Sequence, residues 1–198
     1  KKYPFRNVKV GVVISNFNKM LTDNTVLIDF IEQELKNKGA KIVYVEPQKV
    51  LLLFGKKGID PTLFKESIDI LIVGKMVALN EILKFKKSES KNEKIISDDS
   101  KFNIATKKCE IIKYYLKFSV YQFSLNKFVG SGIVSIGVIK FKFSLEIFKK
   151  MAKRVIESII IKRRKDNEKE IIEIEVYDEF DEIIKGLDKN KANFFNSK

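Results

Sequence analysis

The chain has 198 residues and a formal net charge of +13, and 44% of its residues are hydrophobic. This length is sufficient for one domain with its own core. The sequence contains no histidine and one cysteine, Cys109, which excludes hydrolases with an imidazole base, a disulfide framework and the usual kinds of zinc site.

The first half of the chain alternates patterns of strands and helices. The apolar, β-branched run 8–15 predicts a buried parallel strand. Apolar residues at helical spacing follow, with Asp23 or Asn24 as the cap and Gly39 as the end of the helix. Further strands are predicted at 40–45 and at 68–74 (IDILIVG), with a short helix at 61–67 between them.

The second half begins with a polar segment without periodicity, residues 86–103, which we interpret as an insertion. We predict a helix at 106–116, a strand at 119–125, a turn at 130–132 and a strand at 133–143. A long helix with one apolar face follows, and Ser144 can cap it. The alternation predicts a parallel sheet with helices on both faces.

The domain organisation follows from the same patterns. Residues 1–165 form the predicted α/β domain, with its polar insertion at about 86–103. Residues 166–198 form a charged extension, which includes an alternating segment at 171–176 and an amphipathic piece near 180–187.

Phe17 follows the first predicted strand, where most proteins carry a small or polar residue. Ligands of parallel sheets bind at the carboxyl ends of the strands. The ring therefore either stacks on a flat heterocycle or packs against a helix or a neighbouring subunit.

Three segments in order give the chain a resemblance to the lumazine synthase family. Phe17-Asn18 and then Thr22-Asp23 resemble the family's FN and T-[DE] residues, and IDILIVG resembles its D-A-V-I-x-L-G strand. Residues 123–125 and 133–140 resemble its late serine-leucine strand end and the strand that follows. The resemblance covers about residues 3–155.

This resemblance implies a three-layer α/β/α sandwich around a mainly parallel, flavodoxin-like four-stranded sheet. It also implies a transferase of riboflavin biosynthesis, which condenses a butanone phosphate with a ribitylamino-pyrimidinedione to give 6,7-dimethyl-8-ribityllumazine. A homopentamer and no cofactor are implied as well. The positions that correspond to the family's substrate site are Phe17, Asn18, Glu46, Pro47, Lys75, Met76, Ile136, Lys140 and Arg154.

The sequence departs from the family at most of its catalytic positions. The family's histidine falls near Leu83, no glycine-threonine phosphate loop follows Gly74, and the glutamate of the V-P-G-[AS]-[FY]-E motif is missing after Val45. We therefore expect weak activity. The alternative is an inactive oligomeric scaffold, or a binder of a ribityl or flavin-like ligand, on the same fold.

The sequence argues against two other fold families and two kinds of partner. The first βαβ pattern is similar to an ATP-grasp ligase, but the glycine-rich loop and metal carboxylates are missing, and no GxGxxG follows the first strand. The basic residues are almost all lysines, with only four arginines: Arg6, Arg154, Arg163 and Arg164. Because arginine is the residue that recognises bases and phosphates in a bidentate way, this composition argues against a nucleic-acid partner. No apolar run approaches the roughly 20 residues that span a bilayer, so we expect no membrane partner. The lone cysteine favours an intracellular, reducing compartment, either the cytoplasm or an organelle reached after removal of a targeting segment.

Overall fold

The computed structural model describes residues 3–16, 25–46, 67–85, 107–139, 145–177 and 179–184. The helices are α1 (Thr25–Asn37) and α3 (Leu145–Ser158). The strands are β1 (Lys9–Asn16), β2 (Lys41–Ile42), β3 (Ile70–Phe85), β4 (Lys107–Gln122), β5 (Lys127–Ile139), β6 (Ile159–Asp166), β7 (Lys169–Val176) and β8 (Glu179–Ile184).

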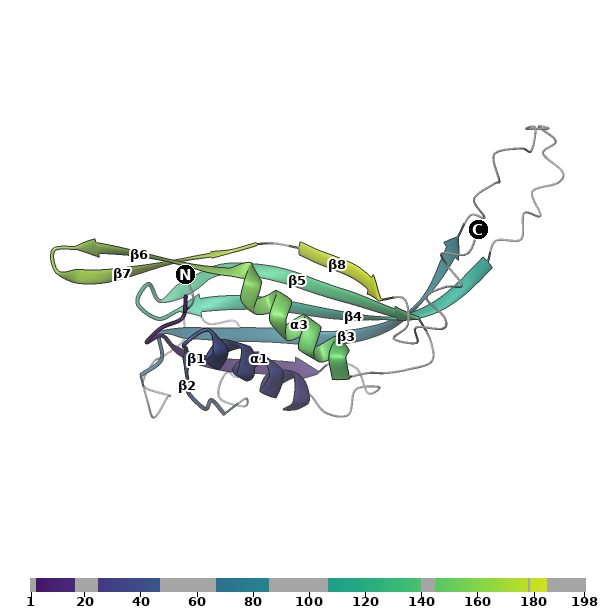
Figure 1. Ribbon diagram of the computed structural model, residues 1–198, viewed down its shortest axis with the longest axis horizontal. Coiled ribbons are helices and arrows are strands. Elements are labelled where there is room, and N and C mark those ends of the chain that lie inside the picture. The colour runs from purple at the N-terminus through teal and green to yellow at the C-terminus, as the bar shows by residue number, and fades with distance from the viewer. Residues whose placement is uncertain are drawn as a thin grey trace, which may run out of the picture.

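Six strands form one mixed sheet in the order β2-β1-β3-β4-β5-β8 (Figure 1). β1 is parallel to both β2 and β3, whereas β3, β4 and β5 are joined by antiparallel pairs. β8 adds parallel to the other side of β5. β3 and β4 have 16 residues each and form the long centre of the sheet.

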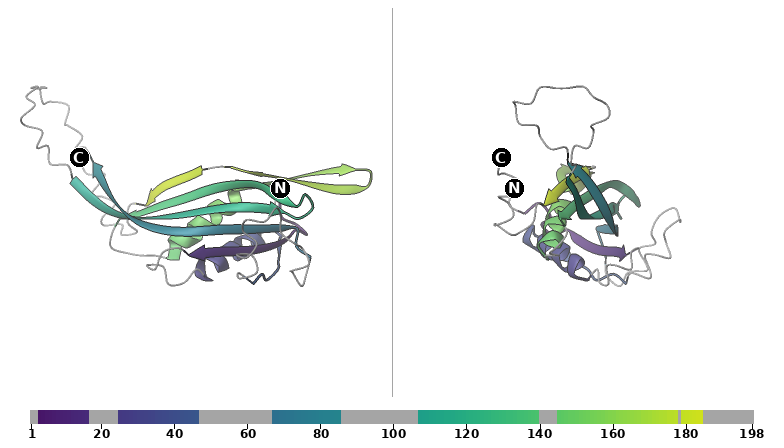
Figure 2. Two further views of the ribbon diagram at one scale, coloured as in Figure 1. Left: turned by 180° about the vertical axis from the view of Figure 1, so that it is seen from behind. Right: turned by 90° about the vertical axis from the view of Figure 1, so that its right-hand side faces the viewer.

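Both described helices pack on the same side of this sheet, where they also contact each other (Figures 1 and 2). α1 buries Leu27, Ile31 and Leu35, which lie at the four-residue spacing of one helix face. α3 buries its own apolar face against inward residues of the central strands, and Tyr114 meets Phe148 edge to face at 6.1 Å. The main core of the protein therefore lies between the helices and the sheet.

The opposite side of the sheet, which we call the far face, carries a second and smaller cluster of buried side chains. Its members are Val13, Val43, Val45, Ile68, Leu71, Val73 and Tyr121. Beyond Val73, the alternate residues of β3 that point to the same side, Lys75 and Leu79, are exposed. One end of the far face is thus buried, and its continuation along β3 is open.

β6 and β7 form an antiparallel hairpin directly after α3 (Figure 1). Its base is anchored by Ile159 and Ile174, which are buried in the main core. Arg163 ties the hairpin to the N-terminal segment, because its guanidinium donates to the carbonyl oxygens of Pro4 and Arg6. The turn at the tip places Asn167 and Glu168 in the left-handed region, with φ of 44° and 66°.

The predicted flavodoxin-like sandwich is wrong. The sheet is mixed rather than parallel, it has six strands, and the described helices cover one side only. The main cause is β3, which continues for eleven residues past Gly74. β4 pairs with it as an antiparallel strand, where the prediction had a crossover helix.

Three predicted elements also need correction. Residues 106–116 do not form a helix, since β4 begins at Lys107. Residues 130–132 are no turn but lie within β5. The helix after Ser144 is confirmed but ends at Ser158, so that Ile159 and Ile160 begin β6. Gly39 does follow α1, with a φ of 92°.

Several other predicted features lie on residues that the structure does not describe. The helix at 61–67, the insertion at 86–103, and the caps Asp23, Asn24 and Ser144 lie wholly or largely outside the described residues. The division at residue 165 stays a prediction, although residues 169–184 of the predicted extension contribute β7 and β8.

Candidate functional site

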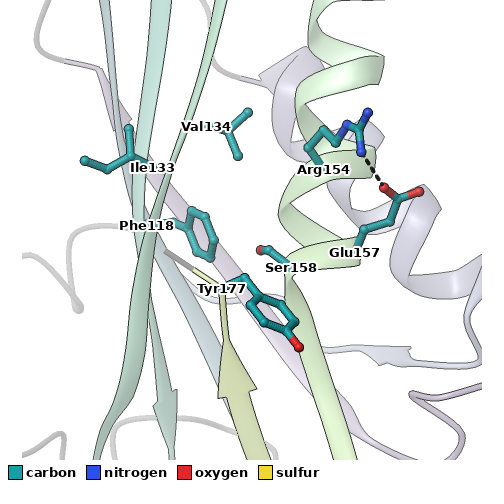
Figure 3. Close-up of a pocket in the computed structure, with 7 residues that line it drawn as sticks. All are labelled: Phe118, Ile133, Val134, Arg154, Glu157, Ser158 and Tyr177. Carbon is teal, nitrogen blue, oxygen red and sulfur yellow. Dashed lines mark hydrogen bonds and ion pairs between the residues drawn. The ribbon is translucent and has the colours of Figure 1, made fainter. Parts of the chain in front are cut away.

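One pocket opens between the C-terminal part of α3 and the central strands, with a volume of about 280 Å³ (Figure 3). α3 supplies polar side chains on one side, and the strands supply apolar ones on the other. Tyr177, which follows β7, closes one end. The lining residues are Phe118, Ile133, Val134, Arg154, Glu157, Ser158 and Tyr177.

Two glycines of β5 allow β7 and Tyr177 to pass close to this pocket. A Cβ atom at Gly130 would lie 2.7 Å from Cγ2 of Val176, and one at Gly132 would lie 2.9 Å from the carbonyl oxygen of Tyr177. The ring of Phe118 also occupies the space over Gly132. Glycine is needed at both positions because another chain segment approaches the strand there.

The polar side chains that α3 contributes to the pocket already have hydrogen-bond or ion-pair partners. Nη1 of Arg154 lies 3.3 Å from Oε2 of Glu157, and the Ser158 hydroxyl donates to the carbonyl oxygen of Val155 at 2.6 Å. The backbone N–H of Tyr177 donates to the carbonyl oxygen of Ser158. With no histidine in the sequence, this arrangement does not provide a hydroxyl nucleophile paired with a base. It can hold a small apolar group beside an ion pair.

A larger groove of about 700 Å³ lies between α1 and α3 and shares Arg154 and Glu157 with the pocket. Its wall on α3 is rich in lysine, with Lys149, Lys150 and Lys153. Glutamates from both helices lie among these cations, including Glu34 on α1. The groove is therefore polar and mixed in charge, which differs from the mostly apolar lining of a typical small-molecule site.

The open part of the far face carries three lysines, which we call the lysine patch: Lys75 of β3 with Lys113 and Lys117 of β4. Lys75 lies directly opposite Lys117 in the antiparallel register, and both side chains are exposed. Tyr115 lies between Lys113 and Lys117 on the same side of β4. On β3, Val77 is half-buried and Leu79 is 48% exposed, so the patch combines cations with apolar side chains.

Asp181 of β8 bounds the lysine patch on one side. Its carboxylate accepts from the Ser135 hydroxyl at 2.7 Å and from Nζ of Lys113 at 3.1 Å. The hydrogen bond from Ser135, aided by Lys113, holds the pKa of Asp181 below its ordinary value. The same ammonium of Lys113 lies 5.3 Å from the centre of the Tyr115 ring. Lys113 is thereby fixed between a carboxylate and an aromatic ring.

The substrate positions that the resemblance implied are scattered through the structure. Met76 and Ile136 are fully buried in the main core, whereas Glu46 and Lys75 are exposed. Arg154 lies in the pocket, away from the far face that carries Lys75. Phe17, Asn18, Pro47 and Lys140 lie outside the described residues, and Leu83 lies in β3 opposite Cys109 of β4.

Sequence reasoning missed Tyr115, Lys117, Ser158 and Tyr177 as candidate site residues. A signal for Lys117 was present, because apolar and polar residues alternate from Leu116 to Val120 with the period of a strand. The β6–β7 hairpin brings Ser158 and Tyr177 together, and their backbone hydrogen bond is not predicted by any local sequence pattern.

The described residues contain no cluster of three or more metal-binding side chains. In the same ranges, no helix is long and apolar enough to cross a bilayer.

No protein-family model matches the sequence, and no curated protein matches it. Among solved structures, a hypothetical protein CT253 from Chlamydia trachomatis shares 10% identity over 67% of this chain and 72% of its own, with a TM-score of 0.42. PelC from Paraburkholderia phytofirmans, solved as a dodecamer, shares 9% identity over 77% and 88%, with a TM-score of 0.42. The lipoprotein GNA1162 from Neisseria meningitidis shares 11% identity over 76% and 96%, with a TM-score of 0.38.

The sheet topology contradicts the flavodoxin-like fold that the resemblance to lumazine synthases implied, and that expected fold is therefore corrected. The activity inferred from the resemblance stays a prediction.

Proposed function

We propose that the protein is a non-catalytic docking module, which binds an acidic segment of a partner protein on the open far face of its sheet. The observation that supports this most directly is the pair Lys75 and Lys117, directly opposite each other on neighbouring strands. Two ammonium groups on neighbouring strands give this part of the far face a positive potential, which favours binding of a carboxylate.

The surroundings of the two lysines suit a protein partner. Val77, Leu79 and Tyr115 provide apolar surface beside the cations, and Ile133 of the next strand is 37% exposed. Protein interfaces combine an apolar centre with a polar and charged rim. A partner segment with carboxylates and a few apolar side chains would complement both features.

A nucleic acid is less well matched to the same surface. Single-stranded nucleic acids bind by stacking their bases on exposed aromatic rings. Tyr115 is half-buried and already has the Lys113 ammonium over its ring. All three cations of the patch are lysines, which lack the planar, bidentate geometry with which arginine recognises bases and phosphates.

A catalytic function has less support than binding. The polar side chains that α3 contributes to the pocket in Figure 3 already have hydrogen-bond or ion-pair partners, and the sequence has no histidine to act as a general base. At about 280 Å³, the pocket is also at the lower limit of volumes that hold small ligands.

The test is fluorescence anisotropy with a labelled polyglutamate peptide that contains a few leucines, at low ionic strength. We expect binding by the full chain, and a loss of about twofold to thirtyfold in affinity for Lys75→Ala/Lys117→Ala, since each exposed ion pair contributes roughly 0.2–1 kcal/mol. The matched control is Lys36→Ala/Lys41→Ala, which removes two exposed lysines from α1 and β2. It should retain nearly all of the affinity.

Two results would overturn the proposal. An equal loss in both double variants would mean that only net charge attracts the peptide. Tighter binding of an oligo-dT strand with the same number of charges would favour a nucleic-acid partner instead. Circular dichroism of each variant checks that the sheet is intact.

A further inference from the structure

β8 lies at one edge of the six-stranded sheet, where it pairs with β5 (Figure 1). Within the ranges that the structure describes, no strand pairs with the other edge of β8. Asp181 of β8 lies beside Ser135 of β5, and Ser135 lies beside Tyr115 of β4. Residues in register point to the same side of a sheet, so Asp181 and Ser135 belong to the far face, like the lysine patch.

Ser135 and Lys113 hold the carboxylate of Asp181 between them. One carboxylate oxygen accepts from the Ser135 hydroxyl at 2.7 Å, and the other accepts from Nζ of Lys113 at 3.1 Å. Ser135 is 4% exposed, and the side chain of Lys113 is 15% exposed. The ammonium also lies 5.3 Å from the centre of the Tyr115 ring. A carboxylate at this place thus meets a hydroxyl donor and a cation that are both largely buried.

Asp181, the residue that occupies this place, is far more exposed than the residues that hold it. Its side chain is 63% exposed. An ion pair with an exposed partner contributes little to stability, because water competes for the charges. β8 has only six residues, and its departure would leave the pairs among β1 to β5 intact. A carboxylate from another molecule can therefore compete with Asp181.

The sequence of β8 has the same chemistry as the segment that we expect the far face to bind. Its residues, Glu-Phe-Asp-Glu-Ile-Ile, comprise three carboxylates and three apolar side chains. The partner segment of the proposed function also combines carboxylates with apolar side chains. β8 is thus similar in composition to that ligand, and it lies beside the surface that binds it.

We propose that Ser135 and Lys113 form a carboxylate-binding site for the acidic partner segment, and that Asp181 occupies this site as an internal competitor. The partner segment displaces β8, pairs with β5 from Ile133 to Val138, and places one of its carboxylates where Asp181 lies in the free protein. This inference rests on the proposed function, because it concerns the same partner. Departure of Asp181 removes a negative charge from beside the lysine patch, which strengthens the attraction of the incoming segment.

The first test is fluorescence anisotropy of the full chain with a labelled peptide of residues 178–185, which contains the sequence of β8. We expect Asp181→Ala to bind it about threefold to sixtyfold more tightly than the wild type, since its own strand then lacks a hydrogen bond and an ion pair. The matched control is Asp166→Ala, which removes an exposed carboxylate from the β6–β7 hairpin. It should bind as the wild type does, and an equal gain in both variants would contradict the proposal.

A second substitution shows whether the peptide enters the site. Asp181→Ala/Ser135→Ala has the same net charge as Asp181→Ala but lacks the hydroxyl that donates to the carboxylate. We expect it to bind the peptide about threefold more weakly than Asp181→Ala, or weaker still. Equal affinity would mean that the lost negative charge alone explains the gain, and the site would be refuted. Circular dichroism checks that the sheet is intact in each variant.

Hydrogen exchange of the wild type detects the displacement without any substitution. A saturating amount of the polyglutamate peptide should make the backbone amides of residues 179–184 exchange faster, while those of β5 stay protected by the new strand. If that peptide binds through Lys75 and Lys117 but exchange in β8 is unchanged or slower, this inference fails and the proposed function stands. If neither peptide binds to the wild type or to Asp181→Ala, both fail.

Discussion

Replacement of Gly132 by alanine tests the close crossing of chain segments beside the pocket. A Cβ atom there would lie 2.8 Å and 2.9 Å from Cζ and Cε1 of Phe118, and 2.9 Å from the carbonyl oxygen of Tyr177. Carbon atoms prefer a separation of about 3.5–4.0 Å. Phe118 is 1% exposed and cannot swing into solvent, so the strand or the ring must shift.

We expect Gly132→Ala to lower the free energy of unfolding by about 1–3 kcal/mol, the usual cost of overpacking a buried site. Urea denaturation followed by circular dichroism would measure it. The matched control is Ser131→Ala, at the neighbouring exposed position of β5, which should stay within about 0.5 kcal/mol of the wild type.

A second substitution identifies the cause of the loss. Phe118→Leu removes both ring atoms that the new methyl group would meet, so Gly132→Ala should cost less in that background by about 0.5 kcal/mol or more. If Gly132→Ala leaves stability unchanged, or costs as much with leucine at position 118 as with phenylalanine, the crossing is not as tight as we argue.

Two further predictions concern titration. Gln122→Glu should cost at most about 1 kcal/mol at low pH, where the protonated carboxyl can still donate to the carbonyl oxygen of Ile172 and only the amide's second hydrogen bond, to the Ser124 hydroxyl, is lost. Burial raises the pKa of the new carboxyl, so the free energy of unfolding of the variant should fall further as pH rises above about 4.3. Urea denaturation at pH values from 3 to 7 would measure this fall, and a flat profile would contradict it. Asp181, whose pKa is lowered by Ser135 and Lys113, should contribute stability that is present above about pH 3.9 and is lost as pH falls through its folded value. Asp181→Asn should therefore lose less stability than the wild type between pH 5 and 2, and equal slopes would refute the role of this carboxylate.

The sequence predicted the elements that show a clear apolar periodicity together with a clear end point. α1 has apolar positions at helical spacing with Gly39 after it, and the apolar run in β1 has the length of one strand. α3 was found because its apolar face is unbroken from Ile147 to Ile156. In these cases local periodicity and tertiary burial agree.

β4 was missed because paired apolar residues such as Ile111-Ile112 and Tyr114-Tyr115 suit both a helix and a strand. The long pairing with β3 decides between them, and that partner is distant in sequence. The hairpin was missed for another reason. Its turn is Asn167-Glu168, with Glu168 at a φ of 66°, whereas hairpin turns are usually recognised by a glycine.

The candidate sites were partly accessible from the sequence. Lys75 and Arg154 were named through the resemblance, but for a substrate site that the sheet topology does not support. The significance of Lys75 depends on the register that places Lys117 opposite it, and register across two long strands is not encoded in either strand alone.

The distribution of charge makes the proposed binding of an acidic segment sensitive to salt. The hairpin from Ile159 to Val176 contains five cations and five anions, so the whole excess of +13 lies in the rest of the chain. Attraction of an acidic segment to the far face depends on this long-range excess, which is screened beyond about 10 Å at 0.1 M salt. Raising the salt concentration from 20 to 150 mM should therefore weaken peptide binding. An affinity that does not change with salt would contradict the proposed role of the lysine patch.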